Sequence, residues 1–97
     1  MALTITDHHI TSDQIDDRAE LRPTVTGDGS AAWGVHGPFT GPRASGRLFD
    51  RNAAITLMTL AETIARPPAA DDRIWLHIAA WCQELRIAPI TPEHLGL

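Results

Sequence analysis

The chain has 97 residues, of which 43% are hydrophobic and 21% are charged, and its formal net charge is −4 at pH 7. This composition is typical of one small globular domain and excludes an intrinsically disordered chain, which would have fewer apolar residues and a higher net charge. The acidic balance also disfavours a general nucleic-acid-binding surface, because neutralising phosphates requires basic residues.

Residues 1–49 and residues 50–97 differ in amino-acid composition and in hydrophobic periodicity. The first part is rich in Thr, Gly, Pro and β-branched residues, whereas the second is rich in Ala, Leu and Ile with a period near 3.6. This order predicts one α+β domain over residues 1–97. We expect a small antiparallel N-terminal sheet of about three strands in residues 1–49, packed by two C-terminal α-helices in residues 50–97.

The N-terminal quarter contains one clear strand signal. Residues 2–6 (ALTIT) alternate apolar and polar side chains, which is the pattern of a half-buried strand, and Asp7-His8-His9 either continues or turns it. The following segment, TSDQIDDRAELRP (residues 11–23), is acidic and weakly patterned. We expect a loop or a short helix there, capped by Thr11 or Ser12.

A hairpin is expected next. Residues 24–26 and 31–35 flank Gly27-Asp28-Gly29-Ser30, and glycine beside aspartate supplies the positive φ that a tight turn needs. Residues 36–46 (HGPFTGPRASG) hold three glycines and two prolines, which predicts a loop that interrupts the sheet. Residues 47–49 form a last short strand or lead directly into the first helix.

Two helices are expected in the C-terminal half. The first begins near Asp50, which is a good N-cap residue, and ends before Pro67-Pro68. The second begins at Asp71 or Asp72 and runs to about Ile87. Thr91-Pro92-Glu93 is the signature of a further N-cap, after which the chain has room for only one or two turns.

The two helices present different surfaces on a helical wheel. The second has a conventional apolar stripe, expected to face the core, with Arg73, His77 and Glu84 on the opposite side. Its apolar residues are Ile74, Trp75, Ile78, Trp81, Cys82 and Leu85.

The first helix has one charge, Glu62, between Asn52 and Ala65. Opposite its apolar face lies an uncharged stripe that consists of Asn52, Thr56, Thr59 and Thr63. Threonine forms helices poorly, but it suits a covered face because its hydroxyl can bond to the carbonyl four residues earlier. We therefore expect this stripe to be partly covered by the second helix, by another copy of the chain or by a different protein. A solvated and merely tolerated stripe is the alternative.

No residue constellation indicates catalysis, a cofactor or a metal. The five histidines lack the spacings of zinc motifs, although a site assembled from distant Asp7, His36 and His94 stays open. No serine lies in a nucleophile elbow, and Cys82 falls on the predicted buried face. We expect no catalytic, cofactor-binding or metal-binding residue, which leaves a small enzyme or metalloprotein as the least favoured hypothesis.

One local basic feature remains. Arg43, Arg47 and Arg51 recur every four residues in and after the predicted Gly/Pro loop. In a loose loop near Trp33 and Phe39, they would contact phosphates or an acidic protein surface, and the alternative is that they are ordinary solvated loop arginines.

The expected location follows from three absences. No apolar run reaches the ~18 residues needed to cross a bilayer. The start, MALTITDHH, has no basic segment followed by an apolar one, and the single cysteine has no internal disulfide partner. We expect a cytoplasmic protein that makes no membrane contact.

Three stretches, TVTGDGSAAW (24–33), RLFDRNAAITLMTLAET (47–63) and RIWLHIAAWCQEL (73–85), carry a resemblance. The chain resembles a set of small proteins of actinobacteria and their phages that have no established activity. The resemblance implies an actinobacterial or phage accessory protein and carries over no site residue.

These observations favour a non-enzymatic protein-interaction module that docks on a protein partner or self-associates. Aromatic residues and arginines are the usual energetic anchors of such surfaces. The candidate contact residues are Trp33, Phe39, Arg43, Arg47, Thr56, Thr59 and Thr63. The alternative is a nucleic-acid-associated regulator that uses Arg43, Arg47 and Arg51.

Overall fold

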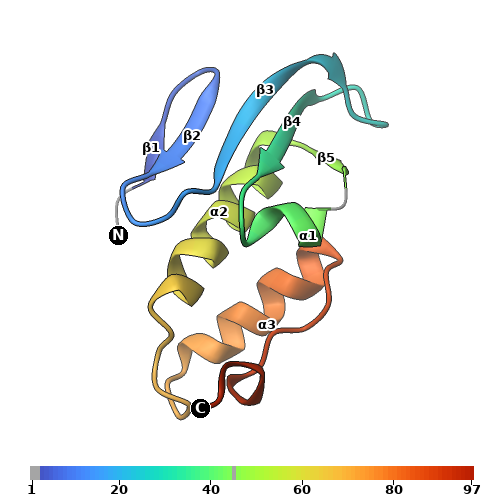
Figure 1. Ribbon diagram of the computed structural model, residues 1–97. Coiled ribbons are helices and arrows are strands. Elements are labelled where there is room, and N and C mark those ends of the chain that lie inside the picture. The colour runs from blue at the N-terminus through green and yellow to red at the C-terminus, as the bar shows by residue number, and fades with distance from the viewer. Residues whose placement is uncertain (1–2, 45) are drawn as a thin grey trace.

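The computed structural model describes residues 3–44 and 46–97 (Figure 1). Its elements in chain order are β1 (Leu3–Ile5), β2 (His9–Ser12), β3 (Arg18–Val25), β4 (Ala31–His36), α1 (Thr40–Ala44), β5 (Leu48–Phe49), α2 (Arg51–Ala65), α3 (Ile74–Leu85) and the 3-10 helix η1 (Pro92–Leu95). The α+β class is confirmed, because an N-terminal antiparallel sheet packs against two main C-terminal helices.

The sheet has five strands in the order β1-β2-β3-β4-β5. Each strand therefore pairs antiparallel with its sequence neighbours, and the expectation of about three strands is corrected. The expected loop or short helix over residues 11–23 is also wrong, because most of that segment lies in β2 and β3. Ile10 and Ala19 explain this difference. They are directly opposite each other across β2 and β3, and both are fully buried, so the two strands pair against the core although acidic residues fill the turn between them.

The predicted hairpin joins β3 to β4. Its turn is closed by a hydrogen bond from the Thr26 amide to the Ser30 carbonyl at 2.8 Å, and Gly29 has a φ of +86°, which glycine adopts without strain. The register between β3 and β4 shifts between Leu21 and Val25, a stretch that contains Pro23. Proline cannot donate to the ladder, so this irregularity falls where the sequence requires one.

The helix boundaries follow local caps. The Asp50 carboxylate accepts a hydrogen bond from the Ala53 amide at 2.7 Å, and α2 ends one residue before Arg66, ahead of Pro67. The Asp72 carboxylate likewise accepts from the Ile74 amide at 3.0 Å. Arg86 ends α3 in the left-handed conformation, slightly earlier than predicted. No helix within residues 3–44 and 46–97 has the length and apolarity of a membrane span.

Helix α2 forms the centre of the core. It contacts β2 and β4 on one side and α3 on another, so it lies between the sheet and α3 (Figure 1). The largest buried side chains come from all three layers: Ile10, Trp33, Leu57, Met58, Leu60 and Ile78. Helix α3 therefore forms an outer layer of the domain, with one face on the core and one face outward.

Candidate protein-interaction surface

Trp33 is not available to a partner. Its side chain is only 2% exposed, and it faces the helices from β4, opposite Leu21 and Phe49 on the neighbouring strands. The prediction that Trp33 is a surface anchor is therefore wrong. The alternation of β4 decides its side, because Trp33 and Val35 point inward while Gly34 and His36 fall on the opposite face.

Phe39 and Arg43 form a stacked pair on the surface. The Arg43 guanidinium lies 3.9 Å from the centroid of the Phe39 ring, and its Nη1 donates to the Phe39 carbonyl at 2.9 Å. Both residues are half-buried. Beside Arg43 runs a groove of about 410 Å³ between α1 and the C-terminal segment, lined in part by Pro42, Ile90 and His94. This pair keeps its place among the candidate contact residues.

Arg47 has a structural role. Its Nη2 donates to the Leu85 carbonyl at 2.8 Å, its Nη1 donates to the Arg86 carbonyl at 3.2 Å, and its guanidinium lies 5.0 Å from the Phe49 ring centroid. These carbonyls are at the C-terminus of α3, where a positive charge is favourable. The guanidinium therefore ties β5 to α3 instead of projecting from a loose loop.

The segment that holds Arg43 is also not the expected loop, because residues 40–44 form α1. The buried Asp17 carboxylate stabilises this short helix by accepting hydrogen bonds from the amides of Phe39 and Thr40 and from the Thr40 hydroxyl. Arg51 lies exposed at the start of α2. Two of the three arginines proposed to contact phosphates are thus engaged within the fold.

The threonine stripe is partly covered within the chain. Thr56, Thr59 and Thr63 are half-buried, whereas Asn52 is exposed. Each threonine hydroxyl donates to the carbonyl four residues earlier, at 3.0, 2.8 and 2.8 Å respectively. The stripe is therefore an uncharged surface whose hydroxyls already have acceptors, so covering it would leave no hydroxyl donor unsatisfied.

Glu62 is a buried acid whose burial the sequence did not reveal. Its side chain faces β2, and its Oε2 accepts a hydrogen bond from the Ser12 hydroxyl at 2.5 Å. Only 5% of the residue is exposed. A groove of about 450 Å³ runs past Glu62, bounded by Gln14, Arg66 and Asp72. The bond to Ser12 gives this carboxylate a structural role, because it fixes α2 to the second strand.

The candidate metal residues do not come together. Within residues 3–44 and 46–97, no group of three or more His, Cys, Asp or Glu side chains is placed to hold a metal ion, and Asp7, His36 and His94 form no such cluster. Cys82 is buried on the inward face of α3, as its position on the helical wheel predicts.

The outward face of α3 is the feature that the sequence analysis missed. Leu76 is 75% exposed, and Ala79, Ala80 and Gln83 lie exposed beside it. Leu76 precedes buried Ile78 by two residues, which is about 200° on a helix, so the two point in opposite directions. The position of Leu76 on the helical wheel indicates this exposure. The prediction from the wheel named only Arg73, His77 and Glu84 on the outward side. We refer to Leu76, Ala79, Ala80 and Gln83 as the α3 outer face.

Three comparisons with known proteins found no match to the chain. No protein-family model matches it. A search of curated proteins and a search of solved structures also found no match.

Proposed function

We propose that the chain is a non-enzymatic protein-interaction domain that docks on a protein partner or on a copy of itself through the α3 outer face. The observation that carries this proposal is the 75% exposure of Leu76 in the middle of a helix face that has no charged side chain between Arg73 and Glu84. Exposed helix faces of soluble domains are normally charged or polar. Burying one leucine against a partner contributes about 2 kcal/mol.

The neighbouring surfaces support the same function. The threonine stripe of α2 is uncharged and its hydroxyls are already bonded, so covering it has a low desolvation cost. The stacked Phe39–Arg43 pair offers an aromatic and a guanidinium group at the edge of a groove. These residues are secondary contact candidates, while the buried Trp33 and the capping Arg47 support the fold.

The proposed setting is an accessory protein of the cytoplasm. The accessory role comes from the resemblance to small actinobacterial and phage proteins, with which the lysine-free set of basic residues agrees, and the proposed location comes from the single cysteine. An accessory protein without chemistry of its own acts by occupying a surface of another protein.

An affinity-capture comparison tests the function. The purified protein is immobilised and exposed to a lysate of its native cells, alongside Leu76→Glu and a control, Val25→Glu. Val25 is 60% exposed in the β3–β4 hairpin, so the control adds the same charge at another exposed apolar position. We expect the wild type and the control to retain the same protein, and Leu76→Glu to lose it.

Two results would count against the proposal. One is equal retention by Leu76→Glu, which would place the contact elsewhere. The other is a wild-type protein that retains nothing and stays monomeric at every concentration. Circular dichroism and thermal unfolding establish that each variant is folded, which is expected because both substituted side chains are solvent-exposed.

A further inference from the structure

We infer that the occupant of the α3 outer face is a second copy of the chain, bound through antiparallel two-fold pairing of the two α3 helices. This inference rests on the proposed function and names the partner. A two-fold interface uses the same surface on both copies, so that surface must be complementary to itself. The α3 outer face has this property in its shape, and the charged residues at the two ends of the face, Arg73 and Glu84, have it as well.

The centre of the face suits close helix packing. Leu76, Ala79 and Ala80 lie within one turn of each other, at spacings of three and four residues. Alanines at a contact let two helix axes approach closely, and the exposed Leu76 of each copy then packs beside the alanines of the other. Every residue of this centre is uncharged, so pairing buries no ion.

The charges at the two ends determine the direction of pairing. Arg73 precedes Ile78 by five residues and Glu84 follows Ala79 by five, so a two-fold axis that passes between Ile78 and Ala79, about one residue from the midpoint of α3, has them at equal distances on either side. They are eleven residues apart, which is about three helical turns, and they therefore lie on the same flank. No ion pair within residues 3–44 and 46–97 involves either side chain.

In an antiparallel two-fold pair, the same flanks of the two helices meet with their ends exchanged. Arg73 of each copy then faces Glu84 of the other, and two ion pairs form. A parallel two-fold pair would instead place this flank on opposite sides of the seam in the two copies, so neither ion pair would form across it. The antiparallel arrangement also aligns the helix dipoles favourably, since each N-terminus meets the C-terminus of the other copy.

The expected association is weak and depends on concentration. Two helices of twelve residues bury less than the ~1,200 Å² that marks a stable complex, so a dissociation constant between about 10 μM and about 1 mM is expected. Sedimentation velocity over this range is the test, with wild type, Arg73→Glu, Glu84→Arg, the double variant and Leu76→Glu measured in parallel.

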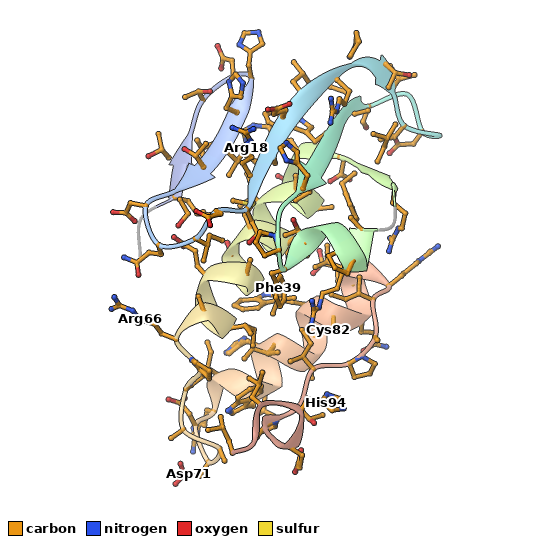
Figure 2. All side chains as sticks on the ribbon, in the orientation of Figure 1. Arg18, Phe39, Arg66, Asp71, Cys82 and His94 are labelled. Carbon is orange, nitrogen blue, oxygen red and sulfur yellow. The ribbon has the colours of Figure 1, made fainter. Side chains whose placement is uncertain are left out.

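Each charge reversal replaces two attractions with two repulsions. We expect the dissociation constant to rise about tenfold in each single variant, because exposed pairs contribute a few-fold each and the symmetry doubles the effect. The double variant restores both pairs and returns to the wild-type value. Arg66→Glu is the control, because Arg66 is an exposed arginine outside α3 that points away from the body of the domain (Figure 2).

The outcomes separate this inference from the proposed function. A wild type that stays monomeric up to about 1 mM overturns the dimer, as does a dimer unaffected by Leu76→Glu. If the double variant remains as weak as the single ones, the antiparallel arrangement is overturned. A monomeric wild type that nevertheless captures another protein in a Leu76-dependent manner removes the second copy as partner and leaves the proposed function standing.

Discussion

The carboxylate of Asp17 holds Thr40 at the start of α1. Its Oδ2 accepts from the Thr40 amide at 2.7 Å and from the Thr40 hydroxyl at 2.8 Å. Both residues are buried, although 23 positions separate them in the chain. This contact joins the β2–β3 turn to the segment that presents Phe39 and Arg43, so the position of that candidate surface depends on one buried acid.

Asp17→Asn is expected to destabilise the domain by about 2 kcal/mol, because hydrogen bonds to a charged acceptor are the stronger ones and the asparagine amide also brings a donor into a site that supplies only donors. Chemical denaturation measures the change. Asp16→Asn is the matched control, since Asp16 is exposed, and it should shift stability by less than about 0.5 kcal/mol. Equal effects at the two positions would show that Asp17 does not organise α1.

Gly37→Ala is expected to destabilise the domain by more than about 2 kcal/mol. Gly37 has a φ of +142°, and a Cβ there would lie 2.5 Å from the Cα of Asp17, which is backbone and has little room to move. Gly41→Ala provides the contrast, because a Cβ at Gly41 meets nothing within 4 Å apart from its chain neighbours and Gly41 lies within α1. We expect Gly41→Ala to change stability by less than about 1 kcal/mol, because the lower entropy of the unfolded chain is offset by contact of the new Cβ with the ring of Pro42, and thermal unfolding measures both variants.

The hairpin turn should lose part of its stabilisation in acid. Hydrogen bonds from the Thr26 hydroxyl and the Ser30 amide lower the pKa of Asp28 from its ordinary 3.8 to about 2. Because the folded-state pKa is depressed, the stabilisation is complete above pH 3.8 and disappears as the pH falls toward 2. The stability difference between wild type and Asp28→Asn should therefore shrink over that window. An Asp28 carboxyl that titrates near 3.8 by NMR would contradict this prediction.

Thr56→Ala is expected to raise the stability of the isolated domain by about 0.5 kcal/mol, since alanine is the better helix former. Thr11→Ala, in an exposed position of β2, should instead lower it slightly, because threonine favours strands. Residues that serve a contact surface are expected to lower the stability of the isolated domain in this way, because their benefit appears only when a partner is bound. Simultaneous replacement of Thr56, Thr59 and Thr63 by alanine should then weaken partner capture, and unchanged capture would remove the stripe from the contact surface.

The sequence correctly predicted those elements whose boundaries are set by residues next to them in the chain. Asp50 and Pro67 delimit α2, and the Gly-Asp-Gly turn sets the β3–β4 hairpin. Helix α1 was not predicted because the side chain that caps it, Asp17, is distant in the sequence. Only the folded sheet brings Asp17 close to Thr40. Strands β2 and β3 were not predicted because the acidic residues of their connecting turn are typical of a loop. The pairing of the buried Ile10 with Ala19 is visible only in the folded sheet.

Only part of the candidate surface could be predicted, because some of its features depend on residue spacing within one helix and others depend on how the elements pack together. Threonines that bond to their own helix can be recognised from spacing alone, and the structure shows those bonds. The burial of Trp33 depends on which face of β4 meets the helices. The exposure of Leu76 depends on α3 forming the outer layer, with its inward face already occupied by Ile78, Cys82 and Leu85. Neither fact follows from composition or from short motifs.

Site-specific photo-crosslinking at position 76 in native cells tests the central claim, that the α3 outer face binds protein, most directly. A photoreactive amino acid replaces Leu76 in one strain and Val25 in a control strain, and both positions are exposed in the free domain. We predict a crosslinked product only from position 76, with the mass of two chains if the partner is a second copy. Irradiated cells in which position 76 gives no product beyond those of position 25 would contradict the account.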